Sequence, residues 1–405
     1  MRQRPALHFT PERGWMNDPH GIVFVDGEYH LFFQYVPRDI AWHNDLEWGH
    51  AVSTDLVTWR QVESALKPLP EETGLWSGSV VIADVPTMFY TNPHPDDWGH
   101  GQLVAARGNR DLTAWERIGV VVDGPPSAEF RDFRDPQVRR DGDVWKMTVG
   151  AGKRDLTGGC ALQYSSSDLL SWDYDGVLAT EPFDATAPIN LGQVWECPQF
   201  LPIDGEWMLT VSAMEMEQTY IRQVYALGAY DGRRFTPRVW GDFGHSRIPY
   251  AMTTFTDADG VPCAMAWLRE SGAEVPAGSP WAGAQSIVHE LHVDGDRVLA
   301  PFHRNLDRVL PAQPLQQIAI DGAVRYRFAP RDVAIGDARH RVEFGFDDGR
   351  VVVRSDGDVV LDAPATTTGV DLVIDAEWVE FVCDDVEGIF VVKLPAMDSP
   401  TLQLR

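Results

Sequence analysis

Three acidic residues stand just before strand-like segments, each followed closely by a proline. They occur in Trp15-Met16-Asn17-Asp18-Pro19, in Phe133-Arg134-Asp135-Pro136 and in Glu196-Cys197-Pro198. Two carboxyl groups flanking a sugar linkage can hydrolyse it, because one attacks the anomeric carbon while the other protonates the leaving oxygen. Asp18, Asp135 and Glu196 are therefore candidate catalytic residues for glycoside hydrolysis, if the fold brings them together.

The surroundings of the three acids predict different protonation states. Glu196 has Trp195 and Cys197 as neighbours and would lie near like charges, so we expect a raised pKa and a retained proton. Asp18 follows an amide and precedes a tight turn, where donors keep a carboxylate ionised. Asp135 is adjacent to Arg134 and should also stay charged. It would then hold sugar hydroxyls or stabilise an oxocarbenium-like transition state.

Aromatic and polar residues in the same stretches are candidate substrate contacts. Indole rings can stack on a sugar ring, and amide, hydroxyl and guanidinium groups can bind its hydroxyls. Each also has an ordinary structural explanation: amides can satisfy backbone groups, indoles can pack in a core, and an arginine can simply pair with its neighbour. The predicted contacts are Trp15, Asn17, Gln34, Trp42, Trp76, Ser77 and Arg134.

Neither a metal site nor a cofactor is expected. His20, His43, His50 and His245 show no ligand spacing. The four cysteines lie far apart and form no Cys-x-x-Cys pair, which also argues against a disulfide framework. They are Cys160, Cys197, Cys263 and Cys383.

An internal repeat supplies the elements that must position the acids. The segment Ser53–Trp59 recurs as Asn109–Trp115 and Ser166–Trp172, with weaker copies beginning at Asp231 and Asp294. Trp59, Trp115 and Trp172 are therefore expected to pack within the repeat, and the aspartates of the motif to form turns. A repeat of roughly 60 residues built from strands and turns is typical of propellers and solenoids.

Asp-Gly pairs separate strand-like runs within most repeats, and such pairs favour tight hairpins. Each repeat then supplies about four strands, so residues 1–310 are predicted to form a five-bladed β-propeller. The innermost strands of a propeller meet at the central channel, where the three acids would converge. The pairs are Asp26-Gly27, Asp141-Gly142, Asp204-Gly205 and Asp259-Gly260.

The repeat stops after about residue 305. Short β-runs with Asp-Gly turns fill residues 318–405 and predict a small C-terminal β-sandwich domain. Residues 311–317 are predicted to be a linker. The fold class expected for the whole chain is therefore all-β.

Composition limits the kinds of binding partner and the cellular location that we expect. The chain has 405 residues with 34 basic and 60 acidic side chains, a formal net charge of −26. Such a charge disfavours nucleic acid and anionic membranes as partners. No apolar run is long enough to span a membrane, and residues 1–11 contain no apolar leader, so a cytoplasmic location is expected. The oligomeric state is left open.

Together, the three acidic motifs resemble the signature motifs of glycoside hydrolase family 32, which includes invertases, sucrose-6-phosphate hydrolases and fructanases. Shorter motifs agree: Gln34-Tyr35, Trp48-Gly49-His50-Ala51, Trp76-Ser77-Gly78-Ser79 and Tyr250-Ala251. The resemblance implies a five-bladed propeller, a β-sandwich and retaining hydrolysis of β-fructofuranosides. It also implies Asp18 as nucleophile, Glu196 as acid/base and Asp135 as transition-state stabiliser. His20 and Val36-Pro37 depart from the family pattern, and the C-terminal part is short.

The predicted function is a β-fructofuranosidase that acts on sucrose or short fructo-oligosaccharides. Three alternatives stay open: a sucrose-6-phosphate hydrolase, a fructosyltransferase, and a non-catalytic fructan-binding propeller. The first alternative needs a cation near the pocket, for which Arg38, Lys153 and Arg154 are candidates.

Overall fold

Antiparallel hairpins organise the computed structural model, which describes residues 2–216, 219–270 and 275–404. Asp26 and Gly27 have φ values of 48° and 93°, and Asp204 and Gly205 have 46° and 86°. Two successive left-handed residues make the type I′ turn, whose twist matches that of the flanking strands. Asp141-Gly142 and Asp259-Gly260 also lie at hairpins, but only their glycines are left-handed.

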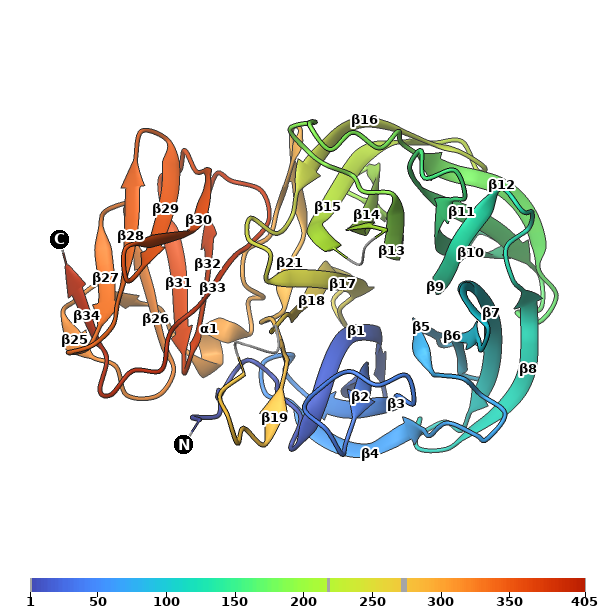
Figure 1. Cartoon of the computed structure of the whole chain (residues 1–405), viewed down its shortest axis with the longest axis horizontal. Helices are drawn as coiled ribbons and strands as arrows, with labels where there is room; N and C mark the ends of the chain where they lie inside the picture. The colour runs from blue at the N-terminus through green and yellow to red at the C-terminus, as the bar shows by residue number, and fades with distance from the viewer. Residues whose placement is uncertain (1, 217–218, 271–274, 405) are drawn as a thin grey trace.

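Four successive four-stranded units form most of a ring, and a fifth group of strands follows them (Figure 1). Within each unit the strands pair antiparallel in chain order. The first strand of each unit lies toward the middle of the ring and the last lies on its outer edge. The units are β1 (Gly14–Val25), β2 (Glu28–Val36), β3 (Glu47–Ser53) and β4 (Arg60–Leu66); β5 (Trp76–Val81), β6 (Thr87–His94), β7 (Asp97–Gly108) and β8 (Trp115–Asp123); β9 (Phe130–Asp141), β10 (Val144–Lys153), β11 (Gly159–Ser166) and β12 (Asp173–Thr180); and β13 (Val194–Ile203), β14 (Glu206–Glu215), β15 (Thr219–Tyr230) and β16 (Phe235–Asp242).

The fifth group differs from the predicted repeat. Its long strands are β17 (Pro249–Thr256) and β18 (Pro262–Leu268), and β18 then pairs with the two-residue strands β20 (Ala284–Gln285) and β21 (His289–Glu290). The Asp294-Gly295 turn lies instead in a separate hairpin of β22 (His292–Asp294) and β23 (Arg297–Leu299). The ring closes where β19 (Trp281–Ala282) pairs in parallel with the start of β1.

The repeated Asp-Leu motif forms the turn between the third and fourth strands of its unit. Leu56, Leu112 and Leu169 all adopt left-handed conformations, with φ between 55° and 68°. The carboxylate of Asp55 accepts the backbone N–H groups of the two residues after Leu56, and Asp168 does the same after Leu169. These aspartates are thus turn residues, as the sequence predicted.

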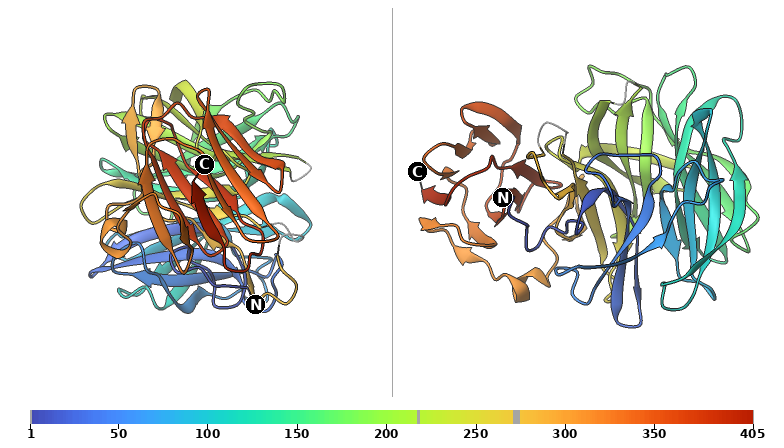
Figure 2. Two further views of the ribbon diagram at one scale, coloured as in Figure 1. Left: turned by 90° about the vertical axis from the view of Figure 1, so that its left-hand side faces the viewer. Right: turned by 60° about the horizontal axis from the view of Figure 1, so that its bottom comes forward.

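The chain beyond the ring forms two sheets that face each other (Figures 1 and 2). Apolar side chains from both sheets, including Phe344 and Phe381, share one buried cluster, which makes this part a β-sandwich. One sheet contains β24 (Gln313–Pro314), β26 (Val324–Phe328), β31 (Val370–Asp375), β32 (Trp378–Cys383) and β33 (Phe390–Lys393). The other contains β25 (Ile318–Ala319), β34 (Thr401–Leu404), β27 (Val333–Gly336), β28 (Arg341–Asp347), β29 (Arg350–Ser355) and β30 (Asp358–Pro364).

A second apolar cluster joins the sandwich to the ring. It contains Val373 and Trp378 from the sandwich together with Met252 and Phe302 from the ring side. Because one face of β31 and β32 meets the other sheet and the opposite face meets the ring, every residue of these two strands is buried. Strand β24 lies within the stretch predicted as a linker.

Helix is almost absent. The only α-helix in the described residues is the four-residue α1 (Leu306–Val309). No helix in the described part of the chain is long and apolar enough to cross a membrane.

Candidate active site

A pocket of about 480 Å³ gathers nine of the ten predicted site residues, which range from Trp15 to Glu196 in the sequence. Asp18, Asp135 and Glu196 all line it, as do Trp15, Asn17, Gln34, Trp42, Trp76 and Arg134. Its size suits a small saccharide, since ligand pockets commonly span about 300–1,000 Å³. Ser77 is not among the lining residues, but it contacts Asp18 directly from behind.

A β-bulge in each inner strand explains how these side chains are presented. Asn17 and Asp18 together oppose one residue of β2, and Cys197 and Pro198 together oppose one residue of β14. Corresponding shifts occur in β5, β9 and β17. A bulge bends its strand and redirects side chains, and bulges are common beside active sites. Asp18 and Asp135 lie within their bulges, and Glu196 directly precedes its own, so a similar local distortion accompanies all three acids.

Unusual backbone conformations accompany the bulges. Asp135, Cys197 and Ala251 have φ values of 59°, 46° and 48°, in the left-handed region that such residues seldom adopt. Prolines follow Asp135 and Cys197, so no backbone N–H is left without a partner immediately after those residues. Strain of this kind persists only where the surrounding structure imposes it.

A closed ring of hydrogen bonds holds the Asp18 carboxylate. Asn17 donates to Oδ1 of Asp18 over 3.0 Å and to the Gln34 carbonyl over 2.8 Å. Gln34 in turn donates to the Ser77 hydroxyl over 2.6 Å, and Ser77 donates to Oδ2 of Asp18 over 2.7 Å. The Trp15 indole donates to Asn17 over 3.1 Å. Ser77 thus orients Asp18, which is a different role from the substrate contact that the sequence predicted.

Burial and hydrogen bonding compete at Asp18. Burial raises its pKa above the ordinary value for aspartate, whereas the hydrogen bonds from Ser77 and Asn17 lower it. Burial outweighs the two donors, so the pKa of Asp18 is raised overall, contrary to the expectation that its donors would keep it ionised. The two donors fix the orientation of the carboxyl group, as an attacking carboxylate requires.

Glu196 is about half protonated at neutral pH. Burial raises its pKa to about 7, and the charges of Asp135 and Asp18 act in the same direction. Arg134 lies 3.2 Å from Oε1 and the Tyr250 hydroxyl lies 2.8 Å from Oε2, and both oppose the shift. The sequence-based expectation of a raised pKa at Glu196 agrees with this environment.

Asp135 is linked to Asp18 through Cys197, which contacts both carboxyl groups. Its Oδ2 accepts the Cys197 backbone N–H over 2.8 Å, and the Cys197 thiol lies 3.6 Å from it and 3.7 Å from Oδ2 of Asp18. Burial raises the pKa of Asp135 to about 6, although Arg134 lowers it. The expected effect of Arg134 is present but is outweighed, so Asp135 is mostly rather than fully ionised at neutral pH.

Arg134 links the acids to the aromatic wall. Its guanidinium pairs with Asp132 at 2.9 Å and with Glu196 at 3.2 Å, and it lies 4.9 Å from the centre of the Trp76 ring. Trp98 stands edge-on to both Trp76 and Trp42, with ring centres 6.1 and 5.9 Å away. Trp42 and Trp98 are 39% and 43% exposed, so this aromatic cluster forms part of the pocket mouth.

Sequence reasoning gave no role to several lining residues. Tyr250 lies nine residues before Asp259, the aspartate of the hairpin in its own unit. Asp18 and Glu196 each lie eight residues before the hairpin aspartate of their units, so the repeat could have identified Tyr250 as a pocket residue. Asp132 and the segment Asp96-Asp97-Trp98, where the turn after β6 leads into β7, belong to no repeated motif. Conversely, His20 is absent from the described lining and packs against Trp48 with ring centres 4.1 Å apart.

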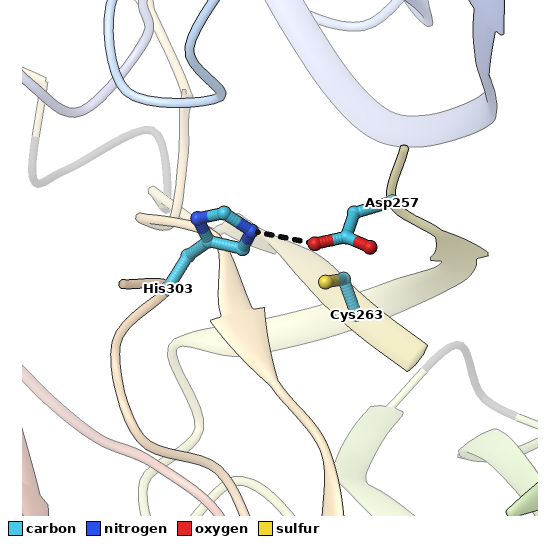
Figure 3. A group of neighbouring side chains, drawn as sticks. All are labelled: Asp257, Cys263 and His303. Atoms are coloured by element: carbon cyan, nitrogen blue, oxygen red, sulfur yellow. Dashed lines mark hydrogen bonds and ion pairs between the residues drawn. The ribbon is translucent and has the colours of Figure 1, made fainter. Parts of the chain in front are cut away.

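One group of potential metal ligands lies outside the pocket (Figure 3). His303 Nε2 is 3.2 Å from Oδ2 of Asp257, and its Nδ1 accepts the Asn305 backbone N–H. The Cys263 thiol donates to a carbonyl, and burial raises its pKa, which disfavours the thiolate that a metal needs. Each of these side chains already has a partner, either in the group or in the neighbouring backbone, so we assign them a structural role. All four cysteines are unpaired and buried.

A ring of β-sheets that brings three carboxyl groups into one saccharide-sized pocket has the architecture and site of a glycoside hydrolase. The chain belongs to glycoside hydrolase family 32: residues 8–301 match the family described as "Glycosyl hydrolases family 32 N-terminal domain".

Relatives and solved structures agree with that assignment. The chain is 33% identical to a Bacillus subtilis levanase over 342 residues, covering 76% of this chain and 48% of the levanase. It is 31% identical to an Escherichia coli sucrose-6-phosphate hydrolase over 318 residues, covering 74% of this chain and 64% of that enzyme. The chain thus spans about half to two thirds of the length of these relatives.

The fold matches a mutant of a Bombyx mori GH32 β-fructofuranosidase solved in complex with sucrose. The TM-score is 0.83 at 23% identity, and the alignment covers 99% of this chain and 91% of that chain. At this level of identity the similarity establishes the fold, a β-propeller followed by a β-sandwich.

Proposed function

We propose that this protein is a retaining β-fructofuranosidase that hydrolyses the terminal β-fructofuranosyl bond of sucrose or short fructo-oligosaccharides. The observation that carries the proposal is the pairing, in one pocket, of an oriented Asp18 carboxylate with a Glu196 whose pKa is about 7. Names of the relatives, levanase and sucrose-6-phosphate hydrolase, point to the same class of substrate.

In the first step, Asp18 attacks the anomeric carbon of the fructosyl unit and forms a covalent ester. Glu196 gives its proton to the leaving oxygen as that bond breaks. Asp135 stabilises the positive charge that develops on the ring. In the second step, Glu196 takes a proton from water, and the resulting hydroxide displaces Asp18 to release fructose. Arg134, Asn17 and Gln34 line the same pocket, and we assign them to bind the fructosyl hydroxyls.

The architecture proposed for this function is a five-bladed catalytic propeller over residues 1–310 and a sandwich domain over residues 318–405. Support comes from the four four-stranded units, the fifth group around β17 and β18, and the closure of β19 on β1. Five inner strands then surround the pocket. We also propose that the protein acts in the cytoplasm, as its sequence led us to expect.

The test is release of fructose from sucrose by the purified chain and by Asp18→Asn. We expect the variant to fold normally and to lose about 10⁴-fold or more in kcat. The catalytic residues act together, so removal of the nucleophile alone removes most of the catalysis. The same assay at high sucrose distinguishes hydrolysis from fructosyl transfer. A wild-type protein that binds sucrose without releasing fructose would instead be a fructan-binding propeller.

A further inference from the structure

The pocket is strongly acidic beyond the catalytic residues. Among the described residues that line it, the carboxyl groups are Asp18, Asp96, Asp97, Asp132, Asp135 and Glu196, and the guanidinium groups are Arg131 and Arg134. Both arginines are already paired with carboxylates. Arg131 lies 2.6 Å from Asp132, and Arg134 contacts Asp132 and Glu196. The electrostatic potential inside the pocket is therefore negative.

Two of these acids lie at the mouth. Asp96 and Asp97 are exposed: Asp96 lies in the turn between β6 and β7, and Asp97 begins β7, next to the half-exposed Trp98. Asp18 and Glu196 also line the pocket and are only partly exposed. With the fructosyl unit over Asp18, the exposed part of the pocket lined by Asp96, Asp97 and Trp98 is open to the sugar that leaves.

The cations that the sequence offered for binding a phosphate lie elsewhere. Arg38 forms an exposed ion pair with Asp45, and Arg154 donates to the carbonyls of Ala128 and Phe130. Lys153 lines a different hollow together with Glu129 and Glu181. None of these three basic residues is part of the pocket lining.

We propose, on the basis of the fructosidase function above, that the pocket accepts an uncharged leaving sugar and rejects a phosphorylated one, and that Asp96 and Asp97 set this preference. Hydroxyl groups of a neutral sugar can donate to these carboxylates, and the Trp98 ring can pack on its face. A phosphate dianion offers no such donors at neutral pH, and like charges across an interface repel. Sucrose 6-phosphate carries its phosphate on the glucosyl unit, which is the leaving sugar.

The experiment compares kcat/KM for sucrose and for sucrose 6-phosphate at low and high ionic strength. We expect sucrose to be favoured about tenfold or more at low salt, because repulsion between exposed charges is then least screened. Raising the salt should increase kcat/KM for the phosphate ester and leave that for sucrose unchanged. This salt dependence separates charge repulsion from a simple lack of space.

Charge variants locate the effect. Asp96→Lys should shift the ratio of the two constants toward the phosphate ester by about three- to tenfold, as expected for reversing one charge some distance from a dianion. Asp97→Asn removes a charge but keeps an oxygen for the Gly99 N–H that Asp97 accepts over 3.0 Å, and should give a smaller shift. The matched control is Glu63→Lys, the same charge reversal at an exposed site on β4, which should leave both constants unchanged.

The outcomes are distinct. Equal or better cleavage of sucrose 6-phosphate, without salt dependence, overturns this inference and leaves the fructosidase proposal standing. An Asp96→Lys ratio equal to that of wild type removes Asp96 from the explanation. Failure to release fructose from either sugar overturns the proposed function, and the inference with it.

Discussion

The phenolic hydroxyl of Tyr250 donates a 2.8 Å hydrogen bond to Oε2 of Glu196. The bond favours the ionised carboxylate and lowers its pKa, whereas burial and the neighbouring acids raise that pKa to about 7. Tyr250 comes from β17 and Glu196 from β13, so a contact between two inner strands adjusts how readily Glu196 gives up its proton.

Replacing Tyr250 with phenylalanine should therefore move the basic limb of the kcat/KM profile to higher pH. Glu196 must be protonated to act as an acid, so activity is lost as pH rises through its pKa. Removing a hydrogen bond to the charged form raises that pKa by roughly 0.5–1 unit, which corresponds to the net free energy of one hydrogen bond. The measurement is a pH–rate profile on sucrose, with Tyr174→Phe on exposed β12 as control. A basic limb that stays in place or moves down would contradict this role.

Glu196→Gln should discriminate between leaving groups. Sucrose needs a proton on its departing oxygen, so we expect kcat to fall by about 10²–10⁴-fold, the usual contribution of general acid catalysis. An aryl β-fructofuranoside releases a stable phenolate and should lose far less in the first step. Pre-steady-state rates of phenolate release measure this. Glu206→Gln, at the far end of the same hairpin, serves as control, and equal losses on both substrates would argue against an acid role.

Asp135→Asn should stabilise the fold while impairing catalysis. The folded-state pKa of Asp135 is raised to about 6, so its ionisation opposes folding above that pH and the penalty disappears below about pH 4. At pH 8 we expect a gain of roughly 2–3 kcal/mol in the free energy of unfolding, since one pKa unit corresponds to about 1.4 kcal/mol. The asparagine carbonyl can still accept the Cys197 N–H.

Urea unfolding at pH 8, 6 and 4 tests this prediction. The gain should shrink steadily toward pH 4. Asp143→Asn, the same change at an exposed turn residue, should follow the wild type at every pH. A variant that is less stable than wild type at pH 8 would show that the Asp135 carboxylate helps to hold the fold.

A buried ionic network predicts a different pH dependence for the join between the ring and the sandwich. His8 lies 3.0 Å from both Asp375 and Glu380, and His289 also binds Glu380. Burial alone would lower the pKa of His8, but its bonds to the two carboxylates raise it to about 9. Because the folded-state pKa is raised, this stabilisation is complete below about pH 6.5 and is lost as pH rises to about 9.

His8→Gln should therefore reduce the free energy of unfolding by about 3–5 kcal/mol at pH 6, as expected when one member of a buried ion pair is removed. The variant should also lose much less stability between pH 6.5 and 9 than the wild type. Thermal unfolding across this range checks both points. His340→Gln, at a more exposed pair on the sandwich, should change Tm little, and a similar effect of the two variants would contradict the network's role.

Local sequence chemistry was enough to predict the hairpins, the turns and the repeated unit of this fold. Asp-Gly pairs specify hairpins because glycine and aspartate accept left-handed conformations, and the Ser-x-Asp-Leu motif specifies a turn through its own side-chain hydrogen bonds. Their recurrence indicated a repeated four-stranded unit. The three acids were expected just before the first strands of their units, whereas they lie within those strands, since β1, β9 and β13 begin earlier than the sequence predicted. Their predicted meeting in a common pocket agrees with the structure.

Contacts between distant segments could be decided only by the tertiary structure. Ser77 became a support for Asp18 and Tyr250 a partner of Glu196 because separate inner strands pack side by side. The pKa of Asp135 rose despite the adjacent Arg134, since burial depends on everything that surrounds a group and not on its neighbours in the sequence. The same holds for the acidic mouth at Asp96 and Asp97. No repeat marks that turn, and only the closed ring brings it to the pocket.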